Sequence, residues 1–452
     1  MQSNYLDNLL AFFSHPFSIP IFLVCSFIII NKSSYSLWLS FGICSFIVTV
    51  VAPPGTFYNL VFPLQEIREF SRPISILFLV AISMRKFLFK EINQHTRKIE
   101  RSTAFIFLAL IVVAVKSIVQ GDFLFGLLSL VTVICLFFAT QHIWINISSL
   151  ARVNLALFSI SLGGFSFIIS CLYQSLFDVN PLIFFNGQFV GLANNPQMAG
   201  LILSLSLPSF LFLWESRETK TWLKLFLPII IVILAYMIFL TGSRTSIFTS
   251  LISLIFYYQN RLSKLFQFSL VIVATLFIIL LISPDNIFSD TILSTSDLSV
   301  NRFTNVTDTR TQVWQNLWSQ FLQYPLLGVP VSGQRIGFGE STWLGAAASL
   351  GLLGLTPLLL FAKNSILTVW SLNFNSVCSK QAFFRPYLSV VNSSFASIFV
   401  SSFAEAYLLG NLAFPIFASL IYILVGSYLS EITTRKLIMN FQGSDNIFAL
   451  RS

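Results

Sequence analysis

The feature that most constrains this chain is a succession of long apolar runs separated by short polar segments. The runs Trp222–Leu240 and Leu265–Ile282 reach the length of about 18 residues at which a helix crosses a bilayer. The chain is 56% hydrophobic and 10% charged, with a mean hydropathy of +0.82, which excludes an ordinary soluble globular protein. One run would be an anchor, but this many predict an all-α polytopic membrane protein.

The apolar runs predict a bundle of about twelve transmembrane helices, with a range of 11–13. The third run is interrupted by Arg85 and Lys86, so an interfacial segment is an alternative interpretation there. The candidate spans are 17–30, 35–52, 73–89, 103–119, 123–140, 153–173, 193–214, 222–240, 245–260, 265–283, 343–362, 386–404 and 412–430.

The distribution of basic residues predicts the orientation of these helices. The net charge of +9 comes from short clusters between apolar runs, which the positive-inside rule explains better than binding to nucleic acid. The strongest cluster, Arg85–Arg101, is expected to be cytoplasmic, and alternation then places the C-terminal tail inside as well. The same alternation places a polar segment, residues 284–341, outside.

The chain therefore divides into three parts. Residues 1–283 are expected to carry nine or ten transmembrane helices, 284–341 a large external loop, and 342–452 about three further helices and a cytoplasmic tail. Within the loop, apolar residues at helical spacing predict an amphipathic helix over 309–323, and Pro325 ends it. Pro325–Gly339 follows with four glycines and two prolines, which suits a re-entrant turn over a cavity.

Several polar residues on the predicted outside face are candidates for a binding or catalytic site. Arginines are normally sparse on that face, so those found there need a reason. A set of guanidinium groups suits bidentate binding of a diphosphate, and a carboxylate beside it can act as a general base. The candidates are Asn194, Asn195, Gln197, Arg244, Arg302, Arg310, Trp314, Arg335, Glu340 and Glu405.

Several of these candidates also have a purely structural interpretation, which stays open at this point. Asn194, Asn195 and Gln197 can simply cap the helix that starts there, and Arg244 can reach lipid phosphate from the membrane boundary. Glu340 can be a dipole partner at a helix N-terminus. No nucleotide-binding or metalloprotease motif accompanies the candidates, so neither a nucleotide nor a metal cofactor is expected, and the favoured substrate is an anionic lipid.

Several short motifs follow one another in a fixed order around the predicted external loop. The motifs are Gly191–Ala199, Ser243-Arg244, Arg310–Trp314, Pro325-Leu-Leu-Gly328, Glu340-Ser-Thr-Trp-Leu344 and Leu350–Gly354. By their order and spacing, the chain resembles the O-antigen ligase and polymerase superfamily over roughly residues 188–410; these are bacterial membrane glycosyltransferases of the GT-C type. One departure is that Glu340 and Ser341 stand where ligases typically have histidine and asparagine.

The resemblance implies a GT-C-like fold in the bacterial inner membrane, with the large loop in the periplasm. It implies a metal-independent inverting transfer from an undecaprenyl-diphosphate-linked glycan. Arg244 and Arg310 would neutralise the diphosphate, and Glu340 would orient or deprotonate the acceptor. Asn194, Asn195, Gln197, Arg302, Trp314, Arg335 and Glu405 would contribute to substrate binding.

We favour an O-antigen or exopolysaccharide polymerase, and an O-antigen ligase that passes the glycan to lipid A core is the alternative. A lipid-glycan transporter is a second alternative. It would place paired charges near the bilayer midplane, whereas this chain has few charged residues within its predicted spans, Lys116 being one possible exception. The expected partners are the lipid-linked glycan and membrane lipid. Whether a chain-length regulator also binds stays open.

Overall fold

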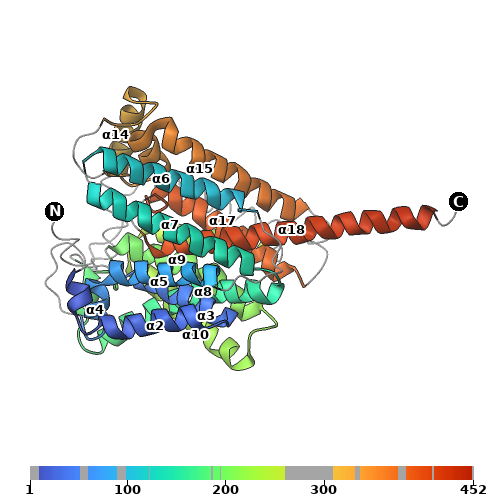
Figure 1. Cartoon of the computed structure of the whole chain (residues 1–452), viewed down its shortest axis with the longest axis horizontal. Coiled ribbons are helices and arrows are strands. Elements are labelled where there is room, and N and C mark those ends of the chain that lie inside the picture. Colours follow the sequence, from blue (N-terminus) through green and yellow to red (C-terminus); the bar gives the residue numbers. More distant parts are fainter. Residues whose placement is uncertain are drawn as a thin grey trace, which may run out of the picture.

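The computed structural model describes residues 10–50, 60–88, 98–121, 123–184, 187–193, 195–259, 309–330, 336–374, 383–409 and 412–449, with only the backbone at 86, 87, 309–311 and 435–449. Long helices and one short hairpin make up this part of the chain (Figure 1). The elements are α2 (Ser18–Ile30), α3 (Ser34–Ile47), α4 (Leu64–Glu69), α5 (Ser71–Leu88), α6 (Arg101–Val119), α7 (Phe123–Asn146), α8 (Leu150–Ser175), η1 (Asn180–Leu182), β1 (Ile183–Phe184), β2 (Gln188–Phe189), α9 (Pro196–Glu215), α10 (Thr221–Leu240), α11 (Arg244–Tyr258), α14 (Thr309–Gln323), α15 (Thr342–Phe374), α17 (Arg385–Ala404) and α18 (Phe414–Ala449).

The architecture is the predicted all-α polytopic membrane fold. Among the described residues, eight helices are long and apolar enough to cross a membrane: α6 to α10, α15, α17 and the Phe414–Thr434 part of α18. Two shorter apolar helices, α2 and α3, precede them. The predicted number of about twelve is therefore not reached within these ranges, and the predicted span 265–283 lies outside the described residues.

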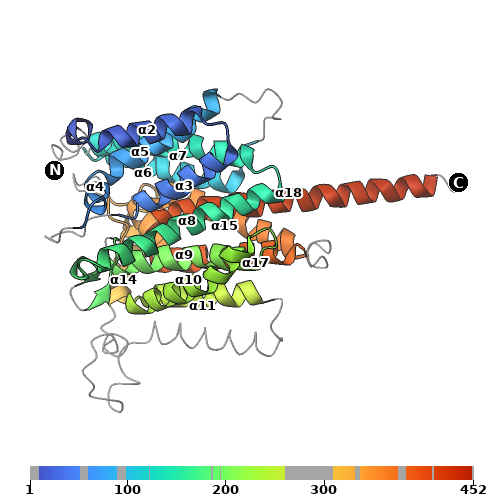
Figure 2. The same ribbon diagram turned by 90° about the horizontal axis from the view of Figure 1, so that it is seen from below.

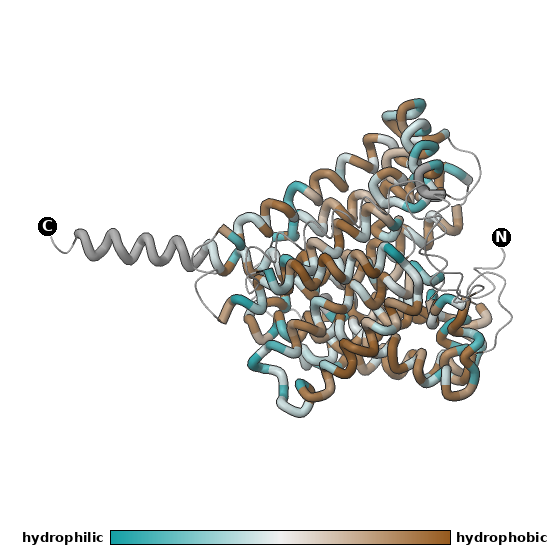
Figure 3. The backbone as a smooth tube through the Cα atoms, turned by 180° about the vertical axis from the view of Figure 1, so that it is seen from behind, coloured by the Kyte–Doolittle hydropathy of each residue, from teal (hydrophilic) through white to brown (hydrophobic). Residues whose placement is uncertain are grey.

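Polarity and burial are arranged as expected for a protein that is dissolved in lipid. The spanning window of α10 has a mean hydropathy of 2.7 with 22% of its residues buried, whereas that of α9 has a mean hydropathy of 1.5 with 83% buried. The most apolar helix thus faces the lipid, and the more polar one lies inside the bundle. In Figure 3, hydrophobic segments predominate in the middle of the bundle and hydrophilic ones are more frequent towards its ends.

Small hydroxylated residues hold the interior helices together. The Ser253 hydroxyl of α11 and the Ser393 hydroxyl of α17 lie 2.7 Å apart, and the Ser161 hydroxyl of α8 donates to Ser209 of α9 at 2.9 Å. In lipid there is no hydrophobic force between helices, so close packing of small residues and such hydrogen bonds stabilise their association. This explains why the buried helices α9 and α17 are rich in serine.

The uncertain third span forms α5, which packs against α2, α3 and α7. Arg85 does not mark a polar surface there, because only 4% of its side chain is exposed. Its guanidinium donates to the Ser36 hydroxyl at 2.6 Å and to the Ser33 carbonyl at 2.7 Å, at the start of α3. Such hydrogen bonds are what allow a charged side chain to be buried within a bundle.

One end of the bundle gathers most of the candidate site. The helices α6, α8, α10 and α17 end there, α7, α9, α11 and α15 begin there, and α14 covers part of it, as Figures 1 and 2 show. Helix α14 has the bounds that the apolar spacing predicted. It packs against α15, to which it is joined through the segment around Pro325.

Candidate functional site

Glu340 lies in a tight turn directly before α15. Gly339 adopts a left-handed conformation, with φ at 62°, and a Cβ atom at this position would lie 2.9 Å from the Leu317 side chain of α14. On the other side, Gly345 has no room for a side chain because it lies against the Phe338 carbonyl. The turn is thus held between α14 and α15. The Glu340 side chain is half-buried, and its Oε2 atom is shielded from solvent.

The end of α17 meets this turn. The Thr342 hydroxyl donates to the Glu405 carbonyl at 2.8 Å, and the Trp343 indole N–H donates to the Ser402 hydroxyl at 3.0 Å. The Trp343 ring also stacks on Phe403, with the ring centroids 5.8 Å apart. The structure therefore brings together the segments that carry the two predicted carboxylates, Glu340 and Glu405, which are far apart in the sequence.

Arg244 begins α11 at the same end of the bundle. The preceding residue, Ser243, caps the helix by accepting the Ser246 backbone N–H at 3.3 Å, so the arginine is the first helical residue. Helices α11 and α17 run antiparallel and touch at Ser253 and Ser393. Arg244 and Ser402 each lie nine residues from that contact along their helices, towards the same end of the bundle. The half-buried Arg244 is therefore level with Ser402, which accepts the hydrogen bond from Trp343.

The start of α9 completes this end of the bundle. The Asn195 side chain caps α9 by accepting the Met198 N–H at 2.7 Å, so this candidate has the structural role that was left open. Gly200, one turn further, lies directly against Ser246 of α11, which places the starts of α9 and α11 side by side. Gln197 is half-buried in the first turn of α9.

Trp314 and Arg310 belong to α14. Trp314 is half-buried, and its indole N–H is shielded from solvent and has no acceptor among the described residues. Arg310 is the second residue of α14, but its side chain lies outside the described part of the chain. Asn194, Arg302 and Arg335 also fall outside the described residues. Their predicted roles in the site therefore stay predictions.

Tyr407 fixes the segment that follows Glu405. Its hydroxyl lies 2.9 Å from the Ser401 hydroxyl and donates to the Ile398 carbonyl at 3.1 Å. Burial raises the pKa of Tyr407 above its usual range because the phenolate would lose its hydration. The tyrosine is thus neutral, and its hydroxyl holds the segment after Glu405 against the last two turns of α17.

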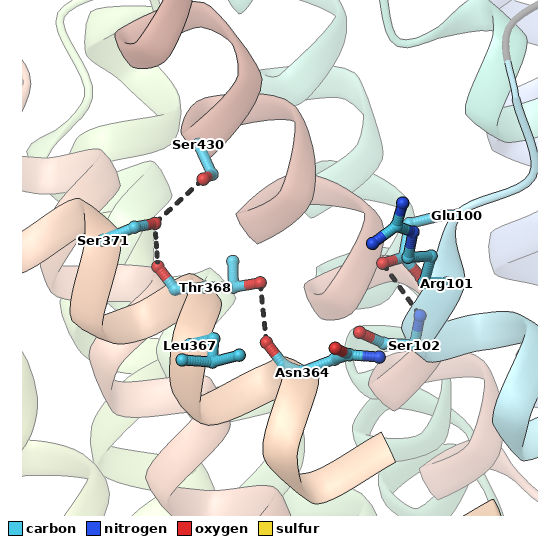
Figure 4. Close-up of a pocket in the computed structure, with 8 residues that line it drawn as sticks. All are labelled: Glu100, Arg101, Ser102, Asn364, Leu367, Thr368, Ser371 and Ser430. Atoms are coloured by element: carbon cyan, nitrogen blue, oxygen red, sulfur yellow. Dashed lines mark hydrogen bonds between the residues drawn. The ribbon is translucent and has the colours of Figure 1, made fainter. Parts of the chain in front are cut away.

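A separate polar pocket of about 260 Å³ lies at the opposite end of α6 and α15 (Figure 4). Glu100 and Arg101 at the start of α6 line it, together with residues from the second half of α15 and from α18. Two hydrogen bonds lie within its lining: the Glu100 carboxylate accepts the Ser102 N–H at 3.0 Å, and the Ser371 and Ser430 hydroxyls lie 2.9 Å apart. This pocket is not part of the candidate site.

The sequence did not single out all the residues that build the site. Ser402 and Thr342 carry the hydrogen bonds between α17 and α15, but nothing in their sequence context distinguishes them from other buried serines and threonines. Trp343 was noticed only as part of a motif. No group of three His, Cys, Asp or Glu side chains that could hold a metal ion occurs in the ranges that the structure covers.

Comparison with known proteins agrees with the predicted resemblance. None of the curated proteins compared matches the chain. Residues 229–359 match the family model described as O-antigen ligase. The matched region runs from α10 into α15 and includes Arg244, α14 and Glu340. This match supports the resemblance to the O-antigen ligase and polymerase superfamily over these residues, and the long apolar helices indicate a multi-pass membrane protein.

Proposed function

We propose that this protein polymerises undecaprenyl-diphosphate-linked oligosaccharide repeat units into O-antigen or exopolysaccharide. The observation that carries the proposal is the Glu340 turn, which α14, α15 and α17 hold in place beside a second carboxylate, at the level of Arg244. A carboxylate held at the same end of the bundle as a guanidinium suits a reaction in which a proton is removed while a diphosphate leaves.

The proposed reaction is a single inverting displacement. A sugar hydroxyl of the acceptor, a second lipid-linked repeat unit, attacks the anomeric carbon of the donor glycan. The bond between that carbon and the diphosphate oxygen breaks, and its electron pair leaves with the lipid diphosphate. Glu340 accepts the hydroxyl proton, while Arg244 and Arg310 stabilise the charge that develops on the leaving group. Trp314, with its shielded indole N–H, offers a hydrogen-bond donor to a sugar oxygen.

The choice of a polymerase over a ligase depends on the identity of residue 340. The matched family is described as O-antigen ligase, but this chain has Glu340 and Ser341 where the resemblance leads us to expect histidine and asparagine in ligases. A carboxylate in place of the histidine supports an acceptor other than lipid A core, and we propose the second lipid-linked repeat unit. The proposal includes a periplasmic site in the inner membrane and a cytoplasmic C-terminus.

Purified protein in proteoliposomes tests the proposal directly. With lipid-diphosphate oligosaccharide as the sole substrate, we expect ladders of longer glycan. Transfer of glycans to a lipid A core acceptor, without ladders, would identify a ligase instead. Absence of both products in folded protein would refute glycosyl transfer.

The role of Glu340 is tested by Glu340→Gln, which keeps the shape of the side chain and removes the basic oxygen. We expect kcat to fall about 100-fold or more. Glu69→Gln is the matched control, because Glu69 is an exposed carboxylate in α4, outside the matched region. Full activity of folded Glu340→Gln would exclude Glu340 as the base.

A further inference from the structure

Helix α15 is broken at Gly351. This residue has φ at 64° and ψ at −155°, which is not helical, although helix continues on both sides of it. The break lies nine residues after Thr342, or about 14 Å along the helix, within a segment long and apolar enough to span the membrane. A break at such depth leaves backbone N–H and C=O groups without their helical partners, and lipid cannot replace them.

The segment after α14 fills the break. The Pro325 carbonyl accepts the Leu352 N–H at 2.7 Å, and the Leu326 carbonyl accepts the Leu353 N–H at 3.3 Å. On the other side of the break, the Val329 N–H donates to the Ala348 carbonyl at 2.9 Å. The loop 325–329 therefore supplies both donors and acceptors, and it packs directly against the break.

Lys116 of α6 closes this arrangement. Its Nζ donates to the Leu327 carbonyl at 2.7 Å, to the Val329 carbonyl at 2.8 Å and to the Ser349 carbonyl at 2.5 Å. An ammonium group has three N–H donors, so all three are used. Two of the carbonyls belong to the loop and one to α15, so this lysine joins three separate segments. We call Lys116, the loop 325–329 and residues 348–353 the clasp.

Ser349 connects the clasp to the candidate site. Its carbonyl accepts from Lys116, and its hydroxyl donates to the Gly337 carbonyl at 2.6 Å. Three residues after Gly337 comes Glu340. Ser349 is thus bonded both to Lys116 and to the segment that leads into the Glu340 turn, so the contacts of Lys116 help to fix the position of the proposed base.

A simpler explanation is that Lys116 extends towards lipid phosphate, since it lies in the last turn of α6. The three short hydrogen bonds to carbonyl groups do not fit this explanation, because none of the donors is left to bind phosphate. Direct binding of the substrate diphosphate is disfavoured for the same reason. A charged residue in a spanning helix is costly, and here the clasp is what compensates for it.

We propose that Lys116 is a positioning residue that holds the Glu340 turn through the clasp. The effect on catalysis rests on the proposed function of Glu340, whereas the clasp itself does not. A proton acceptor displaced by about 1 Å can lose much of its effect on rate, while binding of the lipid-linked glycan elsewhere is unaffected. Loss of the clasp should therefore lower kcat and leave KM for the donor lipid close to that of the wild type.

Hydrogen exchange measured by mass spectrometry tests the clasp without any assay of activity. Lys116→Met removes the three donors, and we expect the amides of Val329, Leu352 and Leu353 to exchange about 10-fold faster or more. Lys116→Arg retains donors and is expected to restore most of the protection. Val115→Met is the matched control, because Val115 is exposed on the neighbouring position of the same helix. Wild-type exchange in Lys116→Met would overturn the proposal.

Ser349→Ala separates the contact of Lys116 with the Ser349 carbonyl from the contact of the Ser349 hydroxyl with Gly337. It also tests the link to Glu340 if Lys116→Met does not fold. It keeps the carbonyl that Lys116 binds and removes the hydroxyl bond to Gly337, so faster exchange is expected around Gly337–Glu340 and not around Val329. In the transfer assay, we expect kcat to fall about 10-fold in Lys116→Met and less in Lys116→Arg and Ser349→Ala. Unchanged exchange and kcat in Ser349→Ala would overturn the connection to Glu340. Wild-type protein that transfers no glycan would refute the proposed function, and the exchange data would still decide whether the clasp exists.

Discussion

Replacing Gly351 with alanine tests the break in α15 most directly, because two costs can be worked out from the structure. The first is backbone strain: with φ at 64° and ψ at −155°, the residue occupies a region that is essentially restricted to glycine, which costs about 1–3 kcal/mol for another residue. The second is overlap. A Cβ atom would lie 2.5 Å from the Leu326 carbonyl group and 2.6 Å from the Gly328 nitrogen, so the loop must move, at about 1–3 kcal/mol.

Two other glycines separate these costs. Gly121 has φ at 89° and nothing within 4 Å of an added Cβ atom, so Gly121→Ala carries strain alone, about 1–2 kcal/mol. Gly337 also has open space around it and no left-handed backbone, so Gly337→Ala should be close to neutral. Gly351→Ala should carry both costs, about 2–6 kcal/mol in total.

The assay is unfolding of the purified protein in mild detergent, titrated with sodium dodecyl sulfate and followed by tryptophan fluorescence. We expect stability to fall from wild type and Gly337→Ala to Gly121→Ala and then to Gly351→Ala. If Gly351→Ala is as stable as Gly337→Ala, the loop 325–329 does not occupy the break in α15, and the clasp is refuted.

Three further substitutions test other contacts by the same unfolding assay. Asn195→Ala removes the cap of α9 and should cost about 1 kcal/mol, whereas Asn195→Asp keeps the acceptor and should be nearly neutral; equal losses would argue against capping. Trp343→Phe loses the 3.0 Å bond to Ser402 and should cost about 1 kcal/mol or more, a loss that should shrink in a Ser402→Ala background. Arg85→Met leaves the Ser36 hydroxyl and a neighbouring carbonyl without their donor and should cost about 1–3 kcal/mol, and a stable variant would show that water replaces the guanidinium.

Features that are determined by residues close together in the sequence could be predicted from it. Helix α14 has its predicted bounds because apolar spacing and a proline are local signals. The apolar spacing did not distinguish which of these residues pack against the bundle: Leu317 is buried, whereas Trp318 is 51% exposed. The cap at Asn195 is likewise local, and it was one of the two roles foreseen for that residue.

The break in α15 could not be predicted in this way. The apolar run predicts a single span over 343–362, which includes the motif Leu350–Gly354. The structure has a longer element, Thr342–Phe374, with a non-helical residue inside it. The cause lies more than 200 residues away in the sequence, at Lys116, and in the loop that follows α14. No local pattern contains that information.

The candidate site was predicted in part for the same reason. Alternation of helices predicts that Arg244, Glu340 and Glu405 share one face of the membrane, and the structure gathers their segments at one end of the bundle. Which of them come into register depends on contacts such as that of Ser253 with Ser393, which composition and spacing do not reveal. Hydroxyl groups that join buried helices carry no distinguishing sequence signal.

The clasp also determines how the loop 325–329 can move. Because Lys116 and the backbone of α15 hold the loop 325–329, this loop cannot swing outward alone; it moves together with the first half of α15 and the Glu340 turn. Release would require several short hydrogen bonds to break together, so release of the loop would be rare and slow. The lipid-linked substrate that we propose would then reach the Glu340 turn laterally from the bilayer, past a clasp that stays closed.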